Sequence, residues 1–355
     1  MQFKDDWEDA KKRFEAWWVG EVLDRPAIQV AAPRDGVERK PIPPPLSLDQ
    51  RWTDVDYVIA VNEERLRTTY FGGEAFPCFW PNLGPDVFAA YLGCQLIFHE
   101  TTSWAKPLIL NWSSPPPLRF DKSNKWWRLT IQLTEAAVQA SQGRWSVGLT
   151  DLHGGMDALA ALRGQQNLAF DVIDNPDKIE REMGFLTPLW FEIYEGLHQI
   201  ARRAVAGSSA WLPAWSPGRW YPVSCDFAAL VSPAAFERFI LPDIEAEVNW
   251  LDHSIFHLDG PGSLPHLETL LHLPRLNGIQ WVPGAGSPSM VHWIPLLKNI
   301  QAHGKILHLS VGADEVEPLL SELSPGGLML STSCATESAA RDLLRRARIA
   351  STGHR

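Results

Sequence analysis

The sequence predicts a single (β/α)8 barrel, in which eight parallel strands alternate with helices. From about residue 145 onward, short apolar runs alternate with longer amphipathic stretches. Short buried strands that alternate with helices are typical of a parallel sheet, and eight such units favour closure into a barrel. An open, doubly wound sheet is the alternative, but no G-x-G-x-x-G motif follows any predicted strand.

The first predicted element is an N-terminal helix within residues 1–24. Trp7, Phe14 and Trp17 recur near one face of this helix, as amphipathic periodicity requires. The barrel is expected over residues 25–348, and we expect all 355 residues to form one domain.

The remaining elements follow from apolar runs, turn residues and helical periodicity. Strands are expected at residues 26–30, 94–98, 145–150, 221–225, 254–258, 278–282, 305–309 and 327–331. Helices are expected at residues 177–205, 234–252, 264–272, 290–302, 313–322 and 336–348. Loop excursions from the barrel are expected at residues 33–50 and 71–93.

Composition and charge limit the classes of function. The chain carries 32 Lys and Arg against 42 Asp and Glu, a net charge of −10, which leaves no basic surface for a nucleic acid. No apolar run reaches the roughly 18 residues that a membrane span needs, and the N-terminal residues lack the apolar stretch of a secretory signal. Four scattered cysteines do not make a disulfide framework, so we expect a cytoplasmic protein.

Polar side chains follow successive predicted strands at the same end of each strand. In a (β/α)8 barrel the loops after the strands converge on one mouth, where catalytic residues lie. The residues that this pattern singles out are Asp151, His153, Asp226, His257, Asp259, Gln280, Trp281, His308 and Cys334. We therefore expect a site for a small molecule at the mouth of the barrel.

His257 and Asp259 lie two residues apart in a predicted strand. Alternation along a strand places both side chains on one face, where a His and a carboxylate are workable metal ligands. Cys334, at the end of the eighth predicted strand, would complete a His/Asp/Cys set across the mouth. The alternative is structural: a core histidine held by a carboxylate, and a cysteine that packs as a small buried residue.

Other residues near the mouth also have two interpretations. Asp151 and His153 precede a Gly-Gly pair and either bind a ligand or hold the loop in an Asx-turn. Asp226 is either a general acid/base or the cap of a following helix. The tryptophans of residues 211–220, Trp220 among them, form either a lid over a ligand or a hydrophobic cover over the barrel end.

Three motifs carry a family resemblance. They are the segments 225–233 and 256–260 and the pair Ser333-Cys334. On these motifs the sequence resembles the uroporphyrinogen decarboxylase superfamily, which includes cobalamin-dependent methyltransferases that act on coenzyme M or related thiols. The matches run over most of residues 25–348 and are dense after residue 145. The resemblance implies a (β/α)8 barrel.

The resemblance also implies roles for single residues. In the methyltransferase branch a His and two Cys bind zinc, and the zinc binds the acceptor thiol. His257 and Cys334 stand at two of these positions, whereas Asp259 stands where the middle Cys would be. A carboxylate makes the ion harder and weakens the case for thiol activation. The methyl donor would be a corrinoid (cobalamin) on a separate partner protein, since the chain has no recognisable corrinoid-binding module.

The leading hypothesis is a metal-dependent methyltransferase that acts on a small thiol or methylated substrate. Its predicted zinc ligands are His257, Asp259 and Cys334. Its predicted catalytic residues are Asp226 and Asp151. Its predicted substrate-binding residues are Trp281, Gln280, His153, Arg34, Trp220 and His308. An apolar surface rich in tryptophan would support a homodimer.

Two alternatives stay open. The decarboxylase branch of the same superfamily uses no metal and holds substrate carboxylates with arginines. A carboxy-lyase of that type would use Asp226 or Asp151 as acid/base and Arg34 as the carboxylate clamp. A carbohydrate-binding or glycoside-cleaving barrel would stack sugars on tryptophan and pair Asp259 with Asp151 or Glu74, about 5–10 Å apart.

Overall fold

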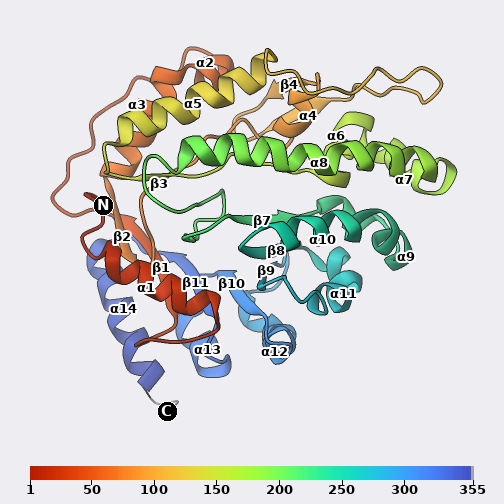
Figure 1. The fold of residues 1–355 in the computed structure, drawn as a ribbon. Helices are drawn as coiled ribbons and strands as arrows, with labels where there is room; N and C mark the ends of the chain where they lie inside the picture. Colours follow the sequence, from red (N-terminus) through yellow and green to blue (C-terminus); the bar gives the residue numbers. More distant parts are fainter. Residues whose placement is uncertain (353–355) are drawn as a thin grey trace.

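The computed structural model describes residues 1–352 and has a mixed α/β fold around a mostly parallel central sheet (Figure 1). The strands are β1 (Ala27–Pro33), β2 (Thr69–Gly73), β3 (Cys78–Phe79), β4 (Gln95–Phe98), β5 (Ser103–Lys106), β6 (Ser146–Val147), β7 (Trp220–Ser224), β8 (His253–Asp259), β9 (Gly278–Val282), β10 (Ile306–Ser310) and β11 (Leu328–Ser333). Seven of them form one sheet in the order β2-β1-β11-β10-β9-β8-β7. Only the β1–β2 pair in this sheet is antiparallel.

The parallel sheet predicted for the second half of the chain is confirmed, but its hydrogen-bonded closure into a barrel is not observed within residues 1–352. β3 and β6 pair in parallel as a separate two-stranded sheet. The backbone N–H of Leu149, just after β6, donates to the carbonyl of Ser209 (2.8 Å). The loop at 205–219 therefore takes the place beside β6 that β7 would occupy in a closed ladder.

Two expectations for the first half of the chain are wrong. The strand at residues 94–98 exists as β4, but it forms an antiparallel hairpin with β5 outside the central sheet. Residues 71–93 are not a loop excursion, because they contain the end of β2, all of β3 and helix α4 (Val87–Tyr91), whose side chains are buried. Short strands and helices of this kind give little periodicity to detect.

The helices surround the sheet. They are α1 (Trp7–Trp18), α2 (Leu48–Thr53), α3 (Val55–Arg67), α4, α5 (Lys125–Ser141), α6 (Gly155–Arg163), α7 (Gln165–Asp174), α8 (Pro176–Ala201), α9 (Pro233–Ala235), α10 (Leu241–Trp250), α11 (Leu267–Leu271), α12 (Ile294–Ala302), α13 (Val316–Glu322) and α14 (Glu337–Thr352). Short 3-10 turns lie at Asp226–Leu230, Pro261–His266 and Met290–Trp293, and a π-helical turn at Phe236–Ile240. No described helix is both long and apolar enough to cross a membrane.

Several helices that periodicity did not predict have clear N-terminal signals. The side chains of Ser47, Asp54 and Asn124 accept hydrogen bonds from backbone N–H groups in the first turns of α2, α3 and α5. Such caps satisfy donors that have no partner within the helix. These three helices begin where the sequence supplies a cap.

The first helix covers the amino ends of the strands. Trp7, Phe14 and Trp17 of α1 are buried in a cluster with Ile255 of β8 and Met329 of β11. Because these strands are parallel, their carboxyl ends all lie at the other end of the sheet, away from α1. The polar residues described below lie at that end.

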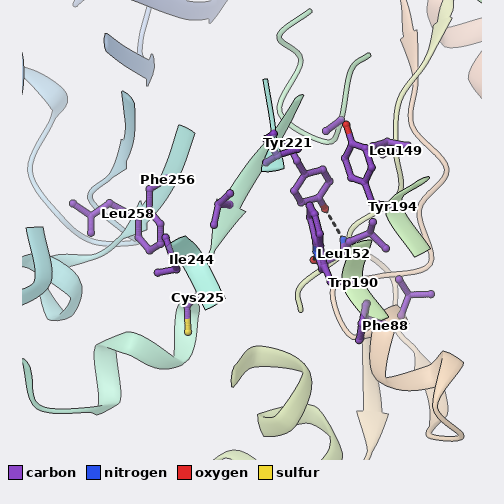
Figure 2. Close-up of a cluster of buried hydrophobic side chains, with 14 of the residues drawn as sticks. Phe88, Leu149, Leu152, Trp190, Tyr194, Tyr221, Cys225, Ile244, Phe256 and Leu258 are labelled. Carbon is purple, nitrogen blue, oxygen red and sulfur yellow. Dashed lines mark hydrogen bonds between the residues drawn. The ribbon is translucent and has the colours of Figure 1, made fainter. Parts of the chain in front are cut away.

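A second buried cluster packs the outer faces of β7 and β8 against helices (Figure 2). Trp190 and Tyr194 of α8 contact Tyr221 of β7, with ring centroids 5.5 and 6.1 Å from the Tyr221 ring. The Tyr221 hydroxyl accepts a hydrogen bond from the backbone N–H of Leu152 (2.5 Å). This bond fixes the start of the segment that carries Asp151.

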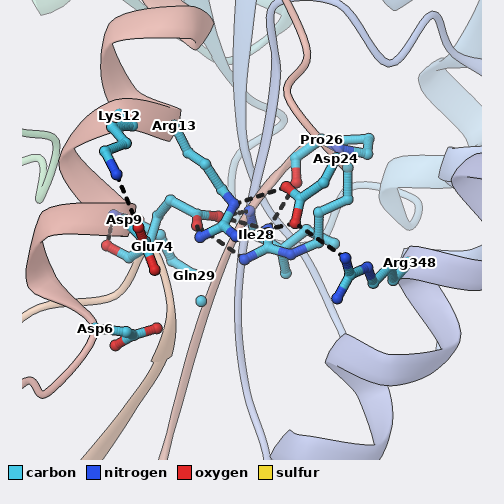
Figure 3. A network of polar contacts seen from close by, with 12 residues as sticks. Asp6, Asp9, Lys12, Arg13, Asp24, Pro26, Ile28, Gln29, Glu74 and Arg348 are labelled. Atoms are coloured by element: carbon cyan, nitrogen blue, oxygen red, sulfur yellow. Dashed lines mark hydrogen bonds and ion pairs between the residues drawn. The ribbon is translucent and has the colours of Figure 1, made fainter.

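A buried ion-pair network joins the chain termini to the sheet (Figure 3). Arg25 donates two hydrogen bonds to the fully buried Glu74 carboxylate, at 2.6 and 2.8 Å, and the Ile28 N–H donates a third at 2.6 Å. Arg13 of α1 lies 3.6 Å from the same carboxylate and also pairs with Asp24. The network therefore fixes α1 and the start of β1 to the end of β2.

We predict that Glu74→Gln lowers the free energy of unfolding by about 3–5 kcal/mol, because it leaves a buried guanidinium without its counter-charge. Urea denaturation measures the change. The matched control is Glu8→Gln, which breaks an exposed pair with Lys11 and should change stability by less than about 1 kcal/mol. Equal effects for the two variants would contradict the prediction.

We predict a second effect, on the pH dependence of stability, at Asp243 of α10. Burial raises the pKa of this carboxyl to about 6, although Thr187 of α8 donates a hydrogen bond to it. A carboxyl whose pKa is raised in the folded state stabilises the fold below about pH 4, and this contribution is lost as the pH rises through 6. Between pH 4 and 8, the free energy of unfolding of wild type should fall by about 3 kcal/mol relative to that of Asp243→Asn. Urea denaturation at each pH measures both values. If the free energies of unfolding of the two proteins change with pH in the same way, the prediction is wrong.

Candidate active site

Strand β8 supplies two polar side chains to the interior of the sheet. Phe256 and Leu258 face outward into the buried cluster of Figure 2, and His257 and Asp259 alternate with them. His257 and Asp259 are partly buried, and a ligand atom of each lies within 4.8 Å of the other. Alternation therefore places the pair on one face, and the pair lies at the carboxyl end of the strand because Asp259 is the last residue of β8.

A layer of hydrogen-bonded polar residues lies across the sheet at the level of His257. Ser331 Oγ donates to Gln29 Oε1 (2.6 Å) and lies 2.8 Å from His308 Nε2. Gln280 Oε1 lies 2.7 Å from His257 Nδ1. Burial lowers the pKa of His308 to about 3, so its imidazole is neutral at physiological pH.

The Gln280 contact determines the tautomer of His257. An amide oxygen accepts hydrogen bonds and cannot donate them, so His257 must carry its proton on Nδ1 when it makes this bond. The lone pair of Nε2 is then available to a cation. Metal-binding histidines typically donate their other N–H to a carbonyl or carboxylate in this way.

Asp226 lies at the junction of two groups of ligating side chains. In one group, ligand atoms of Asp226, His257 and Asp259 all lie within 4.8 Å of one another. In the other, Asp226 lies within the same distance of His153 and Asp157. Asp226 lies two residues after the end of β7 and is exposed, whereas the other four are partly buried.

Asp157 of α6 holds the turn that carries Asp226. Its two carboxylate oxygens accept hydrogen bonds from the backbone N–H groups of Asp226 and Phe227, both at 2.9 Å. Asp157 lies in the first turn of α6, where a carboxylate is also favoured by the helix dipole. These bonds fix the position of Asp226 relative to α6.

His153 lies among carboxylates. Its Nε2 is 3.1 Å from Asp151 Oδ1, and its Nδ1 is 4.0 Å from Asp157 Oδ2. Burial disfavours the imidazolium, but the charges of Asp151, Asp157, Asp226 and Asp86 outweigh burial and raise the His153 pKa to about 9. Without another cation, His153 is therefore protonated at neutral pH.

Burial and mutual repulsion also perturb the acids of this group. Burial is the main cause that raises the pKa values of Asp151, Asp157 and Asp259, and the nearby Asp226 charge raises each of them further. Burial disfavours the ionised form of each carboxyl, and the proximity of Asp226 adds repulsion between negative charges. A divalent cation bound at this group would reduce that repulsion.

A cavity of about 750 Å³ lies beside Trp211, which separates it from His257. The edge of Trp211 contacts the His257 ring, with centroids 5.2 Å apart at 88°, and Trp211 also lines the cavity. Its other walls include Trp80 and Arg65. The Arg65 guanidinium bonds to Asn62 Oδ1 and the Cys78 carbonyl, at 3.3 and 3.4 Å, and has no carboxylate partner within the described residues.

The structure brings together most of the residues predicted to lie at the barrel mouth. His257, Asp259, Asp226 and His153 form the two ligand groups, and Asp151 contacts His153. Gln280 and His308 lie in the polar layer beneath them and are almost fully buried, so they are placed to support the site from below.

Cys334 does not join the predicted ligand set. Within the described residues, no group of three ligand atoms within 4.8 Å of one another contains its thiol. Ser331 faces the polar layer, so alternation places Cys334, three residues later, on the opposite face of the chain. There it lines a different cavity beside Arg34 and Thr69.

Three predicted substrate-binding residues also lie away from the site. Trp281 is fully buried on the outer face of β9 against Trp293, with ring centroids 4.9 Å apart. Trp220 begins β7 at the opposite end of the strands and is buried against Trp18 of α1. Arg34 donates to the Phe3 carbonyl (2.8 Å) on the face of β1 opposite the polar layer.

These positions bear on the alternative functions. Arg34 cannot clamp a carboxylate at the Asp226 group, because it contacts Phe3 and lines other cavities. Glu74 cannot pair with Asp259 in glycoside cleavage, because both of its oxygens bond to Arg25 in the buried network. The carboxy-lyase alternative therefore loses its predicted clamp, whereas the glycoside-cleaving alternative loses Glu74 and keeps Asp151 as the predicted partner of Asp259.

Two site residues were missed. Asp157 stands near the start of a helix that periodicity did not predict, but the Gly-Gly pair before it was a signal for a helix start near the mouth. Arg65 had no sequence signal, since it lies on α3, far along the chain from every predicted strand end.

Comparison with known proteins supports the fold. No family model matches the sequence, and no curated protein matches it either. A solved structure, a methyltransferase from Methanosarcina mazei, is similar over 96% of this chain and 98% of that chain, with a TM-score of 0.61 and 13% sequence identity. At this identity the likeness extends to the fold alone, and it is compatible with the parallel α/β arrangement described above.

Proposed function

We propose that this protein is a metal-dependent methyltransferase for a small thiol or methylated substrate, built on a (β/α)8 barrel. The observation that carries the proposal is the group of Asp226, His257 and Asp259 at the carboxyl end of the parallel strands. Barrel enzymes place their catalytic residues at this end. The similarity in fold to a methyltransferase agrees with the proposed reaction class.

The residues fit a cation that accepts nitrogen and oxygen ligands. One imidazole and two carboxylates give three protein ligands, the number found in catalytic zinc sites that keep a fourth position open. The His-Cys-Cys set that the family resemblance implies does not fit, since Asp259 replaces one cysteine and Cys334 lies elsewhere. Zinc with a His/Asp/Asp set, or a harder divalent ion such as manganese, therefore suits these side chains.

The protein's own residues position the reactants. Gln280 fixes the His257 ring, so Nε2 keeps its lone pair directed away from the polar layer. A bound divalent cation would favour the thiolate form of an acceptor thiol, which is the nucleophile in methyl transfer. Trp211, against His257, excludes water from one side of this position.

The cavity beside Trp211 suits a small anionic substrate. Arg65 offers a guanidinium with no carboxylate partner within the described residues, and the cavity walls are otherwise rich in aromatic side chains. A planar guanidinium binds carboxylate-like groups with two parallel hydrogen bonds. The methyl donor in this proposal is a corrinoid on a separate protein.

An activity measurement tests the reaction class. Purified protein loaded with Zn²⁺ is incubated with methylcobalamin as donor and 3-mercaptopropionate as acceptor, and mass spectrometry follows the methyl thioether. The methyl group leaves cobalt, which keeps the bonding electron pair, and bonds to sulfur, while the thiol proton goes to solvent. Product formed no faster than in the protein-free reaction, with this thiol or with other small thiols, would contradict methyl transfer to thiols.

We predict that His257→Ala and Asp259→Asn each lower the bound Zn²⁺ by one ion per chain, because each removes one of the three ligands of this site. Equilibrium dialysis with elemental analysis measures the bound metal. Cys334→Ala is the control and should bind as wild type does, since its thiol lies in a different cavity. Loss of binding in Cys334→Ala, with binding retained in His257→Ala, would exclude the proposed ligand set.

We also predict that Arg65→Met weakens binding of 3-mercaptopropionate by roughly 10- to 100-fold, the loss expected for a charge-assisted hydrogen bond of about 1.5–3 kcal/mol. Isothermal titration calorimetry measures the change. Arg39→Met, in a neighbouring cavity, is the matched control. An unchanged affinity in Arg65→Met would place the anionic group elsewhere.

A further inference from the structure

The side chains around Asp226 are arranged in two halves. One half is His257 and Asp259 of β8, and the other is His153 and Asp157 at the start of α6. Each half supplies one imidazole and one carboxylate, and each lies within 4.8 Å of a carboxylate oxygen of Asp226. A carboxylate has two oxygens and can bind a different cation through each.

We propose that this site holds two divalent cations bridged by Asp226, the first bound by His257 and Asp259 and the second by His153 and Asp157. The inference rests on the proposed function only in that the first cation is the one proposed there. Paired metal sites, with ions about 3.5–4 Å apart, bind both the attacking and the leaving atoms of a displacement reaction. No residue outside these five is required as a ligand.

Each histidine has a buried oxygen on its far side. Gln280 Oε1 lies 2.7 Å from His257 Nδ1, and Asp151 Oδ1 lies 3.1 Å from His153 Nε2 as an ion-pair contact. In His257 the hydrogen-bonded Nδ1 carries the proton, and in His153 a proton on Nε2, the nitrogen nearest Asp151, would likewise leave the other nitrogen free to bind a cation. For His153 that free nitrogen is Nδ1, the atom that faces Asp157. An acceptor behind each ligating histidine is a regular feature of metal sites.

Asp151 provides an independent indication of a missing cation. The residue is 8% exposed, and its Oδ1 is buried and accepts no hydrogen bond within the described residues. Its one close charged partner is His153. A buried carboxylate that lacks hydrogen bonds is costly unless a nearby ion compensates its charge. A cation bound to the other ring nitrogen of His153 would supply the positive charge that compensates Asp151, from the far side of the imidazole ring.

The position of Asp226 agrees with a bridging role. It is the exposed member of both groups, and its backbone N–H is held by Asp157 at 2.9 Å. The backbone is therefore fixed while the carboxylate remains accessible from solvent. An ion that approaches from solvent along the Asp226 carboxylate can therefore reach either half of the site.

Metal stoichiometry tests the proposal without relying on activity. The probe is Mn²⁺, and the full chain is titrated by calorimetry and analysed by electron paramagnetic resonance. We expect two Mn²⁺ per chain in wild type, with a spectrum of exchange-coupled ions. His153→Ala and His257→Ala should each bind one Mn²⁺ and give the spectrum of an isolated ion. His272→Ala, which removes an exposed histidine far from Asp226 in the sequence, is the matched control.

Variants outside the ligand set separate the two halves. Asp151→Asn should weaken only the second ion and Gln280→Leu only the first, each by roughly 10- to 100-fold, as is typical when the partner behind a ligand is removed. Asp226→Asn should weaken both, because it removes the shared charge. Asp226 is exposed, so this variant is expected to fold, and circular dichroism checks each protein.

The remaining outcomes overturn the proposal. One Mn²⁺ in wild type that persists in His153→Ala and disappears in His257→Ala would exclude the second ion and leave the proposed function intact. Two ions without exchange coupling would exclude the bridge. No bound Mn²⁺, or one that depends on His153 alone, would exclude the paired site, and the Zn²⁺ dialysis described above decides separately on the metal site of the proposed function.

Discussion

The hydrogen bond between His257 and Gln280 connects the interior of the sheet to the charged group at its end. It belongs to a layer in which Gln29, Ser331 and His308 are also hydrogen-bonded, so the ring of His257 cannot turn without disturbing buried polar groups. Buried polar groups that lose a partner cost about 1–3 kcal/mol each. The layer therefore fixes one nitrogen of His257 and leaves the other directed at the carboxylates.

The carboxylates form the opposite side of the site, and holding them there lowers the stability of the fold. Asp157 is anchored by two backbone N–H groups, while Asp151 is buried with little compensation. Burial and repulsion raise the pKa values of both. Evolution of a fold tends to remove such destabilising groups unless function requires them, and perturbed carboxyls cluster at functional sites for this reason.

Alternation along the strands explains both the success and the failure of prediction from the sequence. The second-half strands could be located because their apolar runs are uninterrupted, and His257 and Asp259 could be placed on one face because they are two residues apart. Cys334 and Trp281 were placed wrongly because a neighbouring position in a strand points to the other side. Trp220 was placed wrongly because the sequence does not show at which end of a strand a residue lies. Contacts between remote segments, such as Glu74 with Arg25 and Trp211 with His257, leave no periodic signal at all.

The loop at 205–219 links the incomplete closure of the sheet to the shape of the site. Ser209 accepts the hydrogen bond from Leu149 that would otherwise join β6 to β7, and the Pro213 carbonyl accepts one from Gln29. These two bonds hold the loop between β6 and β1, and this position carries Trp211 to the His257 ring. The same segment that interrupts the ladder therefore forms one wall of the cavity, through Ala210, Trp211 and Pro213.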